Sequence, residues 1–450
     1  MASTPRTTAD QGDPTGAAGA RHAGPADPAR KRKAVAAAAI GNFLEHYDFY
    51  LFAAYATVFA AIIFPQSNQL AGLLYTFAIY GVAFVGRPLG ALVFGHFGDR
   101  LGRRNTLAAS ILLMVGATVM IGVSPSFESV GVFAALWLFV ARLLQGVALG
   151  GEFAGATSYL VELAPPNRRA FYGSFNTFTV GLALLSGTLV AALISAVLPP
   201  EAVQDWGWRI PFLLAAPLGA VGLYLRLRLD ESPEFTALAE RNETAKAPLA
   251  LTLRRYWQPI LVALGVTVVW TVSAFVVLVY AGTYLATQTD LSFGASLAVQ
   301  AVALAVYTIV VPLSASLADR VGRRPVLITG ATMFLLLSIP GFLMLQTGDI
   351  VLIVLGCSML SGTVGVFAGP APTALAEMFD TKVRYSALGI GFNLSVALFG
   401  GTAPLIATAL IGATGTPLAP SFYLTAGALV TLVVLLLVVR ETVRQPLRTG

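Results

Sequence analysis

Twelve apolar segments, each long enough to cross a membrane, constrain this chain more than any other feature of its sequence. An α-helix needs about 20 apolar residues to cross about 30 Å of hydrocarbon. Hydrophobic residues make up 56% of the 450 positions and charged residues 11%, so polar groups cannot cover a water-facing surface. The predicted fold class is therefore an all-α membrane protein with twelve transmembrane helices. The segments are approximately 35–63, 70–98, 105–124, 130–162, 169–198, 208–228, 256–284, 293–317, 325–346, 350–378, 385–412 and 419–440.

The distribution of lysine and arginine predicts the topology. Of the 28 basic residues, 25 lie in the N-terminal tail, the even-to-odd loops and the C-terminal tail. Arg87 and Arg142 lie inside spans, and Arg209 lies on the opposite side. Basic loops stay in the cytoplasm, so both termini are expected there, in a multi-pass protein of the inner or plasma membrane. Because the basic residues mark membrane ends rather than one folded surface, nucleic acid is not an expected partner.

An internal repeat divides the chain into two halves. The segment 98–104, Gly-Asp-Arg-Leu-Gly-Arg-Arg, returns at 318–324 as Ala-Asp-Arg-Val-Gly-Arg-Arg. A second set of positions agrees: Glu162, Arg168 and Asn176 match Glu377, Arg384 and Asn393. Parallel halves place a substrate site at the midplane between them. The predicted units are a disordered tail 1–33, a six-helix bundle 34–228, a cytoplasmic linker 229–255, a second six-helix bundle 256–440 and a tail 441–450.

Several motifs carry a family resemblance. They are the doubled Asp-Arg-x-Gly-Arg-Arg loop, Gly-Asn-Phe-Leu-Glu-His-Tyr-Asp-Phe at 41–49, Arg-Pro-Leu-Gly at 87–90, Arg-Leu-Leu-Gln-Gly at 142–146 with Gly-Gly-Glu at 150–152, Gly-Trp-Arg-Ile-Pro-Phe at 207–212 and Phe-Gly-Gly-Thr-Ala-Pro at 399–404. The loop resembles the signature of the major facilitator superfamily, and the set resembles its metabolite:proton symporter family over about 35–440. The resemblance implies transport of a metabolite such as α-ketoglutarate, citrate, shikimate, proline or betaine. His46 departs from that family, which usually has an aromatic residue there.

Five ionisable residues lie near mid-membrane in the predicted spans, all in the first half: Glu45, Asp48, Arg87, Arg142 and Glu152. Charges at this depth are costly, so such residues mark functional sites by default. The rise per residue places Asp48 and Arg142 near mid-depth, which predicts that they pair. Arg87 is expected to pair with Glu45 or Glu152, and the sequence does not choose between them.

Two interpretations of these charges stay open. In the first, the pairs only neutralise one another and hold the helices in register. In the second, a substrate carboxylate takes the guanidinium of Arg142, and Asp48 then binds a proton because it has lost its partner. The second interpretation assigns proton coupling to Asp48, Glu45 and Glu152, and substrate binding to Arg142, Arg87 and Gln145.

The predicted function is secondary active import of a small organic acid with a proton, because arginine grips a carboxylate in two bonds. A zwitterionic osmolyte such as proline or betaine is the main alternative, its cation held by aromatic faces. An exporter or uniporter of the same fold is a further alternative. The second half offers three candidate substrate ligands: Trp270, Gln300 and Tyr307.

The repeated loops predict a cytoplasmic gate. Asp99 is expected at the N-terminus of a neighbouring helix, with Asp319 as its repeat, Arg103 beside Glu162, and Arg323 beside Glu377. Gly146 is expected to permit close approach of two helices. No Walker loop, zinc-type cluster or Ser-His-Asp set is visible, so neither an enzyme nor a cofactor is expected beyond the proton gradient. The expected partners are the substrate, protons and the lipid bilayer, and the expected state is a monomer.

Overall fold

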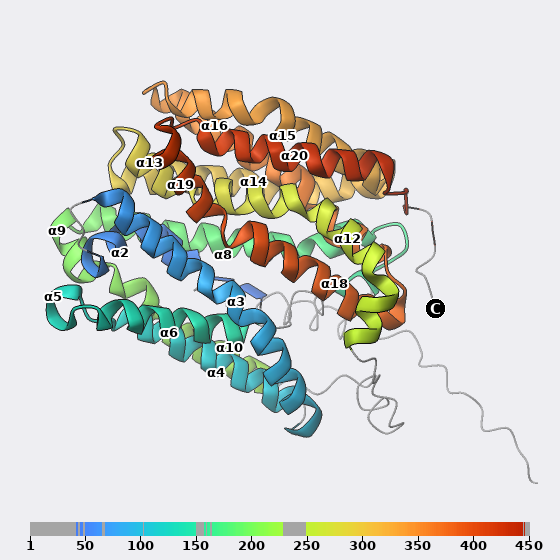
Figure 1. Cartoon of the computed structure of the whole chain (residues 1–450), viewed down its shortest axis with the longest axis horizontal. Helices are drawn as coiled ribbons and strands as arrows, with labels where there is room; N and C mark the ends of the chain where they lie inside the picture. Colours follow the sequence, from blue (N-terminus) through green and yellow to red (C-terminus); the bar gives the residue numbers. More distant parts are fainter. Residues whose placement is uncertain are drawn as a thin grey trace, which may run out of the picture.

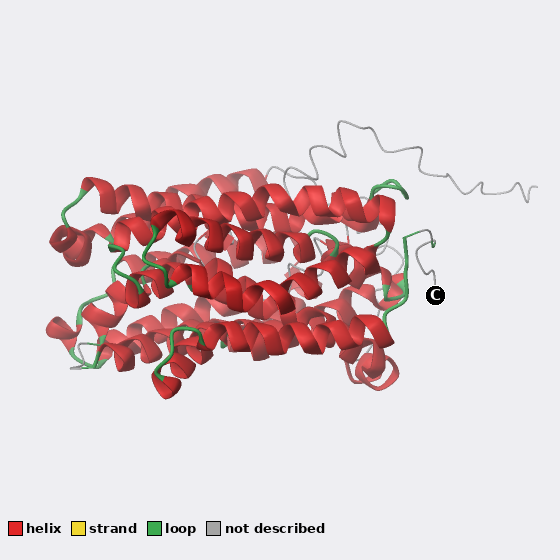
Figure 2. Cartoon of the chain, turned by 90° about the horizontal axis from the view of Figure 1, so that it is seen from above, coloured by secondary structure: helices red, strands yellow, loops and turns green. Residues whose placement is uncertain are grey.

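The structure is a computed structural model that describes residues 42–43, 46–47, 50–64, 68–101, 103–149, 157–158, 160–162, 164–227, 249–443 and 445. All regular secondary structure in these residues is helical, and the helices run side by side along the long axis of the molecule (Figures 1 and 2). Within the described residues, eight helices are long and apolar enough to cross a membrane, and three shorter helices are also apolar. Each of the twelve predicted spans includes helical structure in the part of the chain that is described.

The helices of the first half pack mainly on one another, α3 against α6 and α4 against α10. The first predicted span is divided at Tyr55, so that α2 is only its second part. The helices are α2 (Ala56–Ile63), α3 (Gln69–Leu101), α4 (Arg103–Gly122), α5 (Phe127–Val130), α6 (Phe133–Ala148), α8 (Arg169–Val197), α9 (Pro200–Ala202), the π-helix η1 (Val203–Gly207) and α10 (Arg209–Leu227).

The helices of the second half pack in the same manner, with α15 against α16 and α20, and α12 against α18 and α20. The halves meet where α8 runs along α14 and where α3 contacts α19 (Figure 1). The helices are α12 (Leu249–Ser273), the π-helix η2 (Ala274–Val279), α13 (Ala281–Gln288), α14 (Phe293–Val321), α15 (Arg323–Leu345), α16 (Ile350–Ala368), α17 (Ala371–Glu377), α18 (Thr381–Ser395), the π-helix η3 (Val396–Gly400), α19 (Ala403–Thr414) and α20 (Ala419–Leu437).

The end of the predicted linker differs from the expectation. Helix α12 begins at Leu249, so the last residues of 229–255 are helical. The backbone of Tyr256 is non-helical, with φ −116° and ψ 18°, and this kink separates that first turn from the span proper. The composition identified the polar stretch. It did not indicate that residues 249–255 are helical, because polar residues also form helices.

Three spans of the second half are interrupted although their sequences are continuously apolar. η2 and η3 replace part of an α-helix, and Gly369 and Pro370 separate α16 from α17. In the π-helices the N–H of Tyr280 donates to the carbonyl of Phe275 (2.9 Å), and that of Gly401 to the carbonyl of Val396 (2.7 Å). Such breaks occur at membrane depth where protein buries them, and π-bulges often lie at functional sites.

Arg209 ties two helices of the first half together at the end opposite the basic loops. Its Nη1 donates to the carbonyl oxygens of Gly122 (3.1 Å) and Ser124 (2.6 Å), where α4 ends. Its guanidinium carbon lies 4.3 Å from the ring centroid of Trp208, which is buried against Phe59. A cation at a helix C-terminus satisfies carbonyls that the helix leaves unpaired. The Gly-Trp-Arg motif therefore has a structural role here.

Glycines bring α3 and α6 into backbone contact. A Cβ on Gly86 would lie 2.9 Å from the carbonyl oxygen of Leu143, and one on Gly146 would overlap the carbonyl oxygen of Ala83. The close approach expected at Gly146 is therefore present. It holds α6, which carries Arg142, directly against the helix that carries Arg87.

We predict that Gly146→Ala lowers the melting temperature of the purified protein. The added methyl group meets backbone that cannot move aside, and overpacking of this kind costs about 1–3 kcal/mol. Gly116→Ala on α4 is the matched control, because a Cβ there meets nothing within 4 Å. Thermal unfolding followed by tryptophan fluorescence in detergent measures both, and equal melting temperatures would contradict the packing described.

Candidate functional site

Arg142 lies in the middle of α6 with no part of it exposed. Its Nη1 donates to Oε1 of Gln145 (2.8 Å), and its Nη2 donates to the carbonyl oxygen of Tyr80 on α3 (3.1 Å). Its guanidinium carbon lies 4.8 Å from the ring centroid of Phe52 and 4.7 Å from that of Tyr80. Cation–π contacts strengthen when the cation is removed from water. Three helical segments therefore hold this guanidinium in a defined position.

Gln145 orients the guanidinium from one turn further along α6. Residues three apart share a helix face, and Gln145 is as fully buried as Arg142. Its Nε2 donates to Oγ1 of Thr118 on α4 (2.8 Å), and that hydroxyl donates to the carbonyl oxygen of Met114 (3.0 Å). The amide is thus fixed at both ends. It presents its oxygen to Arg142, which makes Gln145 a positioning residue for the charge.

A second guanidinium lies on the same face of α3 as the ring of Tyr80. The guanidinium carbon of Arg87 lies 4.9 Å from the ring centroid of Phe84, one turn earlier. The acids predicted to pair with these arginines, Asp48, Glu45 and Glu152, lie outside the described residues. Their pairing with Arg142 and Arg87 therefore stays a prediction.

Aromatic rings connect this region to the second half. The ring centroid of Phe275, in η2, lies 5.2 Å from that of Phe84, 6.4 Å from that of Tyr80 and 6.5 Å from that of Tyr50. Phe275 is not among the site residues predicted from the sequence. One phenylalanine in an apolar span has no distinguishing pattern, and only the packing of the halves brings it to the two arginines.

The three ligands expected from the second half have different surroundings. Trp270 packs on Phe392, with ring centroids 5.3 Å apart, inside its own bundle. Nε2 of Gln300 donates to the carbonyl oxygen of Leu278 in η2 (2.7 Å), which ties α14 to that π-helix. The hydroxyl of Tyr307 donates across the two halves to the carbonyl oxygen of Thr177 (3.4 Å). All three are buried, and none of these contacts tests whether it also binds substrate.

A polar network that the sequence analysis did not foresee joins three segments of the first half. Nδ2 of Asn42 donates to the carbonyl oxygen of Asn176 (3.1 Å) and to Oγ1 of Thr179 (2.6 Å). Nδ2 of Asn176 donates to Oγ1 of Thr157 (2.8 Å). His46 lies beside this network: its Nδ1 is 2.8 Å from the carbonyl oxygen of Asn42, and its ring stacks on Tyr50. His46 therefore has a helix partner in Asn42 and a ring partner in Tyr50.

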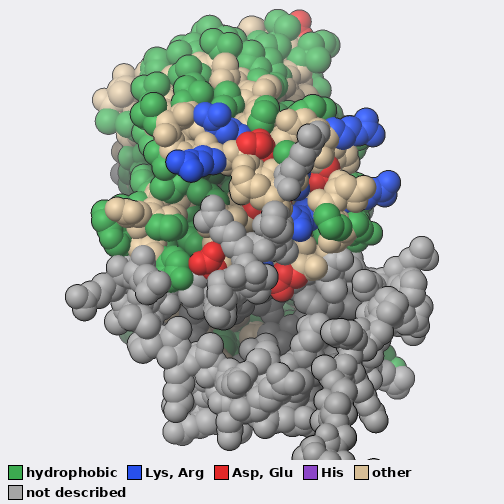
Figure 3. Space-filling model, turned by 90° about the vertical axis from the view of Figure 1, so that its right-hand side faces the viewer, with side chains coloured by type: hydrophobic (Ala, Val, Ile, Leu, Met, Phe, Trp, Pro, Cys, Tyr) green, Lys and Arg blue, Asp and Glu red, His purple; other side chains and the backbone are tan. Residues whose placement is uncertain are grey.

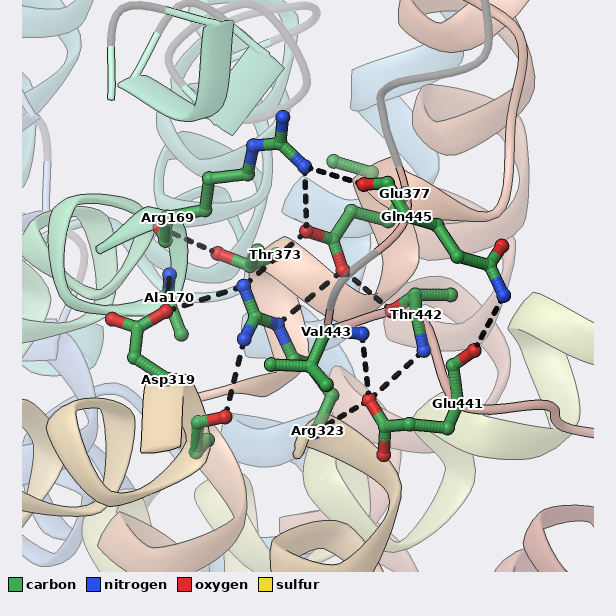
Figure 4. Close-up of polar contacts among 12 residues, drawn as sticks. Arg169, Ala170, Asp319, Arg323, Thr373, Glu377, Glu441, Thr442, Val443 and Gln445 are labelled. Atoms are coloured by element: carbon green, nitrogen blue, oxygen red, sulfur yellow. Dashed lines mark hydrogen bonds and ion pairs between the residues drawn. The ribbon is translucent and has the colours of Figure 1, made fainter. Parts of the chain in front are cut away.

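The end of the molecule that carries the basic loops is the charged end. Its described side chains include arginines and acids set among apolar residues (Figure 3). Arg323 lies between two carboxylates there, with Nη2 3.2 Å from Oδ1 of Asp319 and Nε 3.4 Å from Oε2 of Glu377 (Figure 4). The expected neighbourhood of Arg323 and Glu377 is present. The side chains of Asp99 and Arg103 lie outside the described residues.

Several contacts among the described residues of the charged end cross from one half to the other. The carboxylate of Asp319 accepts the backbone N–H groups of Ala170 and Phe171 (both 2.9 Å), at the N-terminus of α8. Nη1 of Arg169 lies 3.8 Å from Oε1 of Glu377. Glu162, expected beside Arg103, pairs with Nη1 of Arg384 at 2.6 Å. Arg384 had appeared in the sequence only as a repeat position, and the contact between bundles gives it this partner.

The segment after α20 docks on the same charged end (Figure 4). The carboxylate of Glu441 accepts the backbone N–H groups of Arg323 (3.0 Å) and Arg324 (2.9 Å), which begin α15. Oγ1 of Thr442 donates to Oε2 of Glu377 (2.5 Å), and the carbonyl oxygen of Gln445 accepts from Nη1 of Arg169 (2.9 Å). The predicted tail 441–450 therefore begins as part of the charged network.

We predict that Glu377→Gln destabilises the protein far more than Glu162→Gln. The Glu377 side chain is 4% exposed and Arg323 2%, so the change removes one of the two carboxylates that face this buried guanidinium and leaves Asp319 as the other; breaking a buried pair costs up to about 3–5 kcal/mol. The Glu162 side chain is 42% exposed, so solvent partly screens its pair with Arg384, and that guanidinium, itself 1% exposed, keeps its bonds to the carbonyl oxygens of Ala376 and Phe379. Melting temperatures of the two variants provide the comparison. A larger loss for Glu162→Gln would contradict the burial described.

Sequence comparison assigns the family. The profile of the family described as sugar (and other) transporter matches residues 34–255 and again 247–449. The chain is 35% identical over 415 residues to the ectoine/proline transporter ProP of Corynebacterium glutamicum, covering 88% of this chain and 82% of that one. It is 33% identical over 431 residues to the proline/betaine transporter of Escherichia coli K12, covering 94% and 86%.

Structural comparison supports the same fold. The partially occluded inward-open structure of the xylose transporter XylE from E. coli superposes with a TM-score of 0.73, over 91% of this chain and 98% of that one, at 19% identity. The predicted twelve-helix architecture is confirmed, as is the expectation that the chain is a transporter and not an enzyme. The protein is a multi-pass protein of the plasma membrane. The chain belongs to the sugar (and other) transporter family of the major facilitator superfamily and is a secondary transporter.

Proposed function

We propose that this transporter imports a small zwitterion of the proline and betaine type together with a proton. The observation that carries the proposal is the fully buried guanidinium of Arg142, held against aromatic faces at mid-span. Relatives named for proline, betaine and ectoine support a zwitterion over the organic acid that the sequence analysis placed first. A zwitterionic osmolyte is therefore the proposed substrate.

The two charges of a zwitterion have separate counterparts in this site. A planar guanidinium grips a carboxylate in two parallel bonds, and Gln145 already orients Arg142 for this. The ring of Tyr80 lies against this guanidinium, Phe84 packs on Tyr80 and Phe275 packs on Phe84, and aromatic faces attract a substrate cation. A simple organic anion would use only the first of these two features.

Proton coupling is assigned to Asp48, with Glu45 and Glu152 as further acids on the same route. When the substrate carboxylate takes Arg142, Asp48 loses its counter-charge at membrane depth and binds a proton. Binding of substrate and of the proton then favour each other, as linkage requires. Arg87 is the second cation available to this group of acids.

Alternating access would rock residues 34–228 against 256–440, with both termini in the cytoplasm and the protein acting as a monomer. The contacts of Asp319 and Glu377 with α8, and of Arg384 with Glu162, support a gate at the charged end, with Arg323 between the two carboxylates. Charge networks of this kind close one side of the molecule and break when that side opens. Asp99 and Arg103 would take the equivalent places in the first half.

Uptake into proteoliposomes tests the substrate assignment. Under an inward proton gradient we expect accumulation of labelled proline and glycine betaine, and none of succinate or citrate. Arg142→Ala is expected to raise KM about tenfold or more, since a hydrogen bond to a charged group contributes about 1.5–3 kcal/mol. Arg168→Ala, at an exposed position, is the control and should leave uptake unchanged. Uptake of the dicarboxylate with exclusion of both zwitterions would overturn the proposal.

A second experiment tests proton coupling. We expect Asp48→Asn to abolish accumulation driven by the proton gradient while exchange of internal for external substrate continues, because the amide cannot bind the proton. Asp290→Asn, an exposed acid at the opposite end, is the matched control. Full accumulation by the Asp48 variant would rule the coupling scheme out.

A further inference from the structure

Gly400 and Gly401 of the Phe-Gly-Gly-Thr-Ala-Pro motif support two aromatic rings, one from each half. They end η3, where the eleventh span is broken. A Cβ on Gly400 would lie 2.8 Å from Cε2 of Phe275, and a Cβ on Gly401 would overlap the ring of Phe84. The two rings meet at 5.2 Å with an interplanar angle of 75°. Glycine at both positions is what lets an edge-to-face pair form against the backbone.

Phe275 is held by a π-helix and not by an ordinary turn. It lies in η2, whose extra residue changes the direction of the side chains that follow. Gln300 pairs with the Leu278 carbonyl in the same π-helix (2.7 Å), so the irregular backbone is fixed from α14. The Phe275 side chain is buried. Two π-helices therefore set the position of Phe275 between the halves: η2, which contains it, and η3, whose Gly400 packs against its ring.

The ring pair contacts one guanidinium of the candidate site directly and the other through Tyr80. Arg87 lies on the face of Phe84 at 4.9 Å. The ring centroid of Tyr80 lies 5.6 Å from that of Phe84, 6.4 Å from that of Phe275 and 4.7 Å from the Arg142 guanidinium carbon. A zwitterion whose carboxylate lies on Arg142 would have to extend along the Tyr80 ring to bring its cation to the Phe84 and Phe275 rings.

We propose that the Phe84–Phe275 pair is the cation subsite and that Phe275 makes it selective for a quaternary ammonium. The proposal rests on the proposed function, which places the carboxylate on Arg142. Phenylalanine offers an electron-rich face but no hydrogen-bond acceptor. A primary or secondary ammonium buried there would leave N–H groups unpaired, which is costly, whereas a fully methylated nitrogen has none to satisfy. The pair thus favours a methylated cation over an N–H cation of the same charge.

The test measures KM for glycine betaine and for proline in proteoliposomes made from the full-length chain. Phe275→Leu is expected to raise KM for glycine betaine about tenfold, the loss of a desolvated cation–π contact, and KM for proline less than about threefold. Phe275→Tyr keeps the aromatic face and should retain glycine betaine affinity within about twofold. Phe392→Leu, which removes a ring packed on Trp270, is the matched control and should change both substrates equally or not at all.

Two results would overturn the proposal: equal factors for both substrates in Phe275→Leu, or no change in either. If Phe275→Leu does not fold, Phe84→Leu on the other side of the pair must show the same selective loss, and an equal loss there overturns the proposal as well. A wild-type chain that carries neither substrate would overturn the proposed function itself. A wild-type chain that carries both, with equal losses in the variants, would overturn only the quaternary selectivity.

Discussion

The buried guanidinium of Arg142 lies at mid-span in a membrane protein, and the surrounding helices are arranged to hold it. Placing an arginine at mid-bilayer costs about 3 kcal/mol on the insertion scale, and more if it faces lipid alone. Contacts of Arg142 offset this cost: the amide of Gln145 on α6, the backbone carbonyl and ring of Tyr80 on α3, and the ring of Phe52 in the first span. These contacts need α3 and α6 to touch backbone to backbone, which the glycines on both helices permit. The helix packing and the chemistry of the site are therefore one arrangement.

The two halves are joined by two kinds of contact. At the charged end, carboxylates of one half meet a helix N-terminus and arginines of the other, in directional bonds that water can replace when that side opens. Deeper in the molecule the contact is aromatic, between Phe275 and the rings of Tyr80 and Phe84. This contact has no fixed donor geometry, so it can adapt to a ligand. The segment with Glu441, which follows α20 in the chain, joins the charged network through hydrogen bonds to the N-terminus of α15.

Breaks in the helices fall where the halves approach the site. η2 carries Phe275, and η3 ends at the glycines that support the ring pair. Gln300, a predicted substrate ligand, pairs with the π-helix that carries Phe275. Irregular backbone at membrane depth persists only when protein satisfies its polar groups. Hydropathy does not detect such breaks, because the interrupted spans are as apolar as the continuous ones.

The sequence by itself determined that the protein lies in a lipid bilayer, how many spans it has and to which family it belongs. Lipid forces every backbone group to pair within a helix, so apolar length alone specifies each span, and the doubled basic loop marks the two halves. It also pointed to Arg142, because a charge in an apolar run is conspicuous in one dimension. Only the tertiary structure decided what meets that charge. Whether Glu162 lies near Arg384, and whether Phe275 lies near Phe84, depends on how two bundles pack, which the order of residues along one chain does not specify.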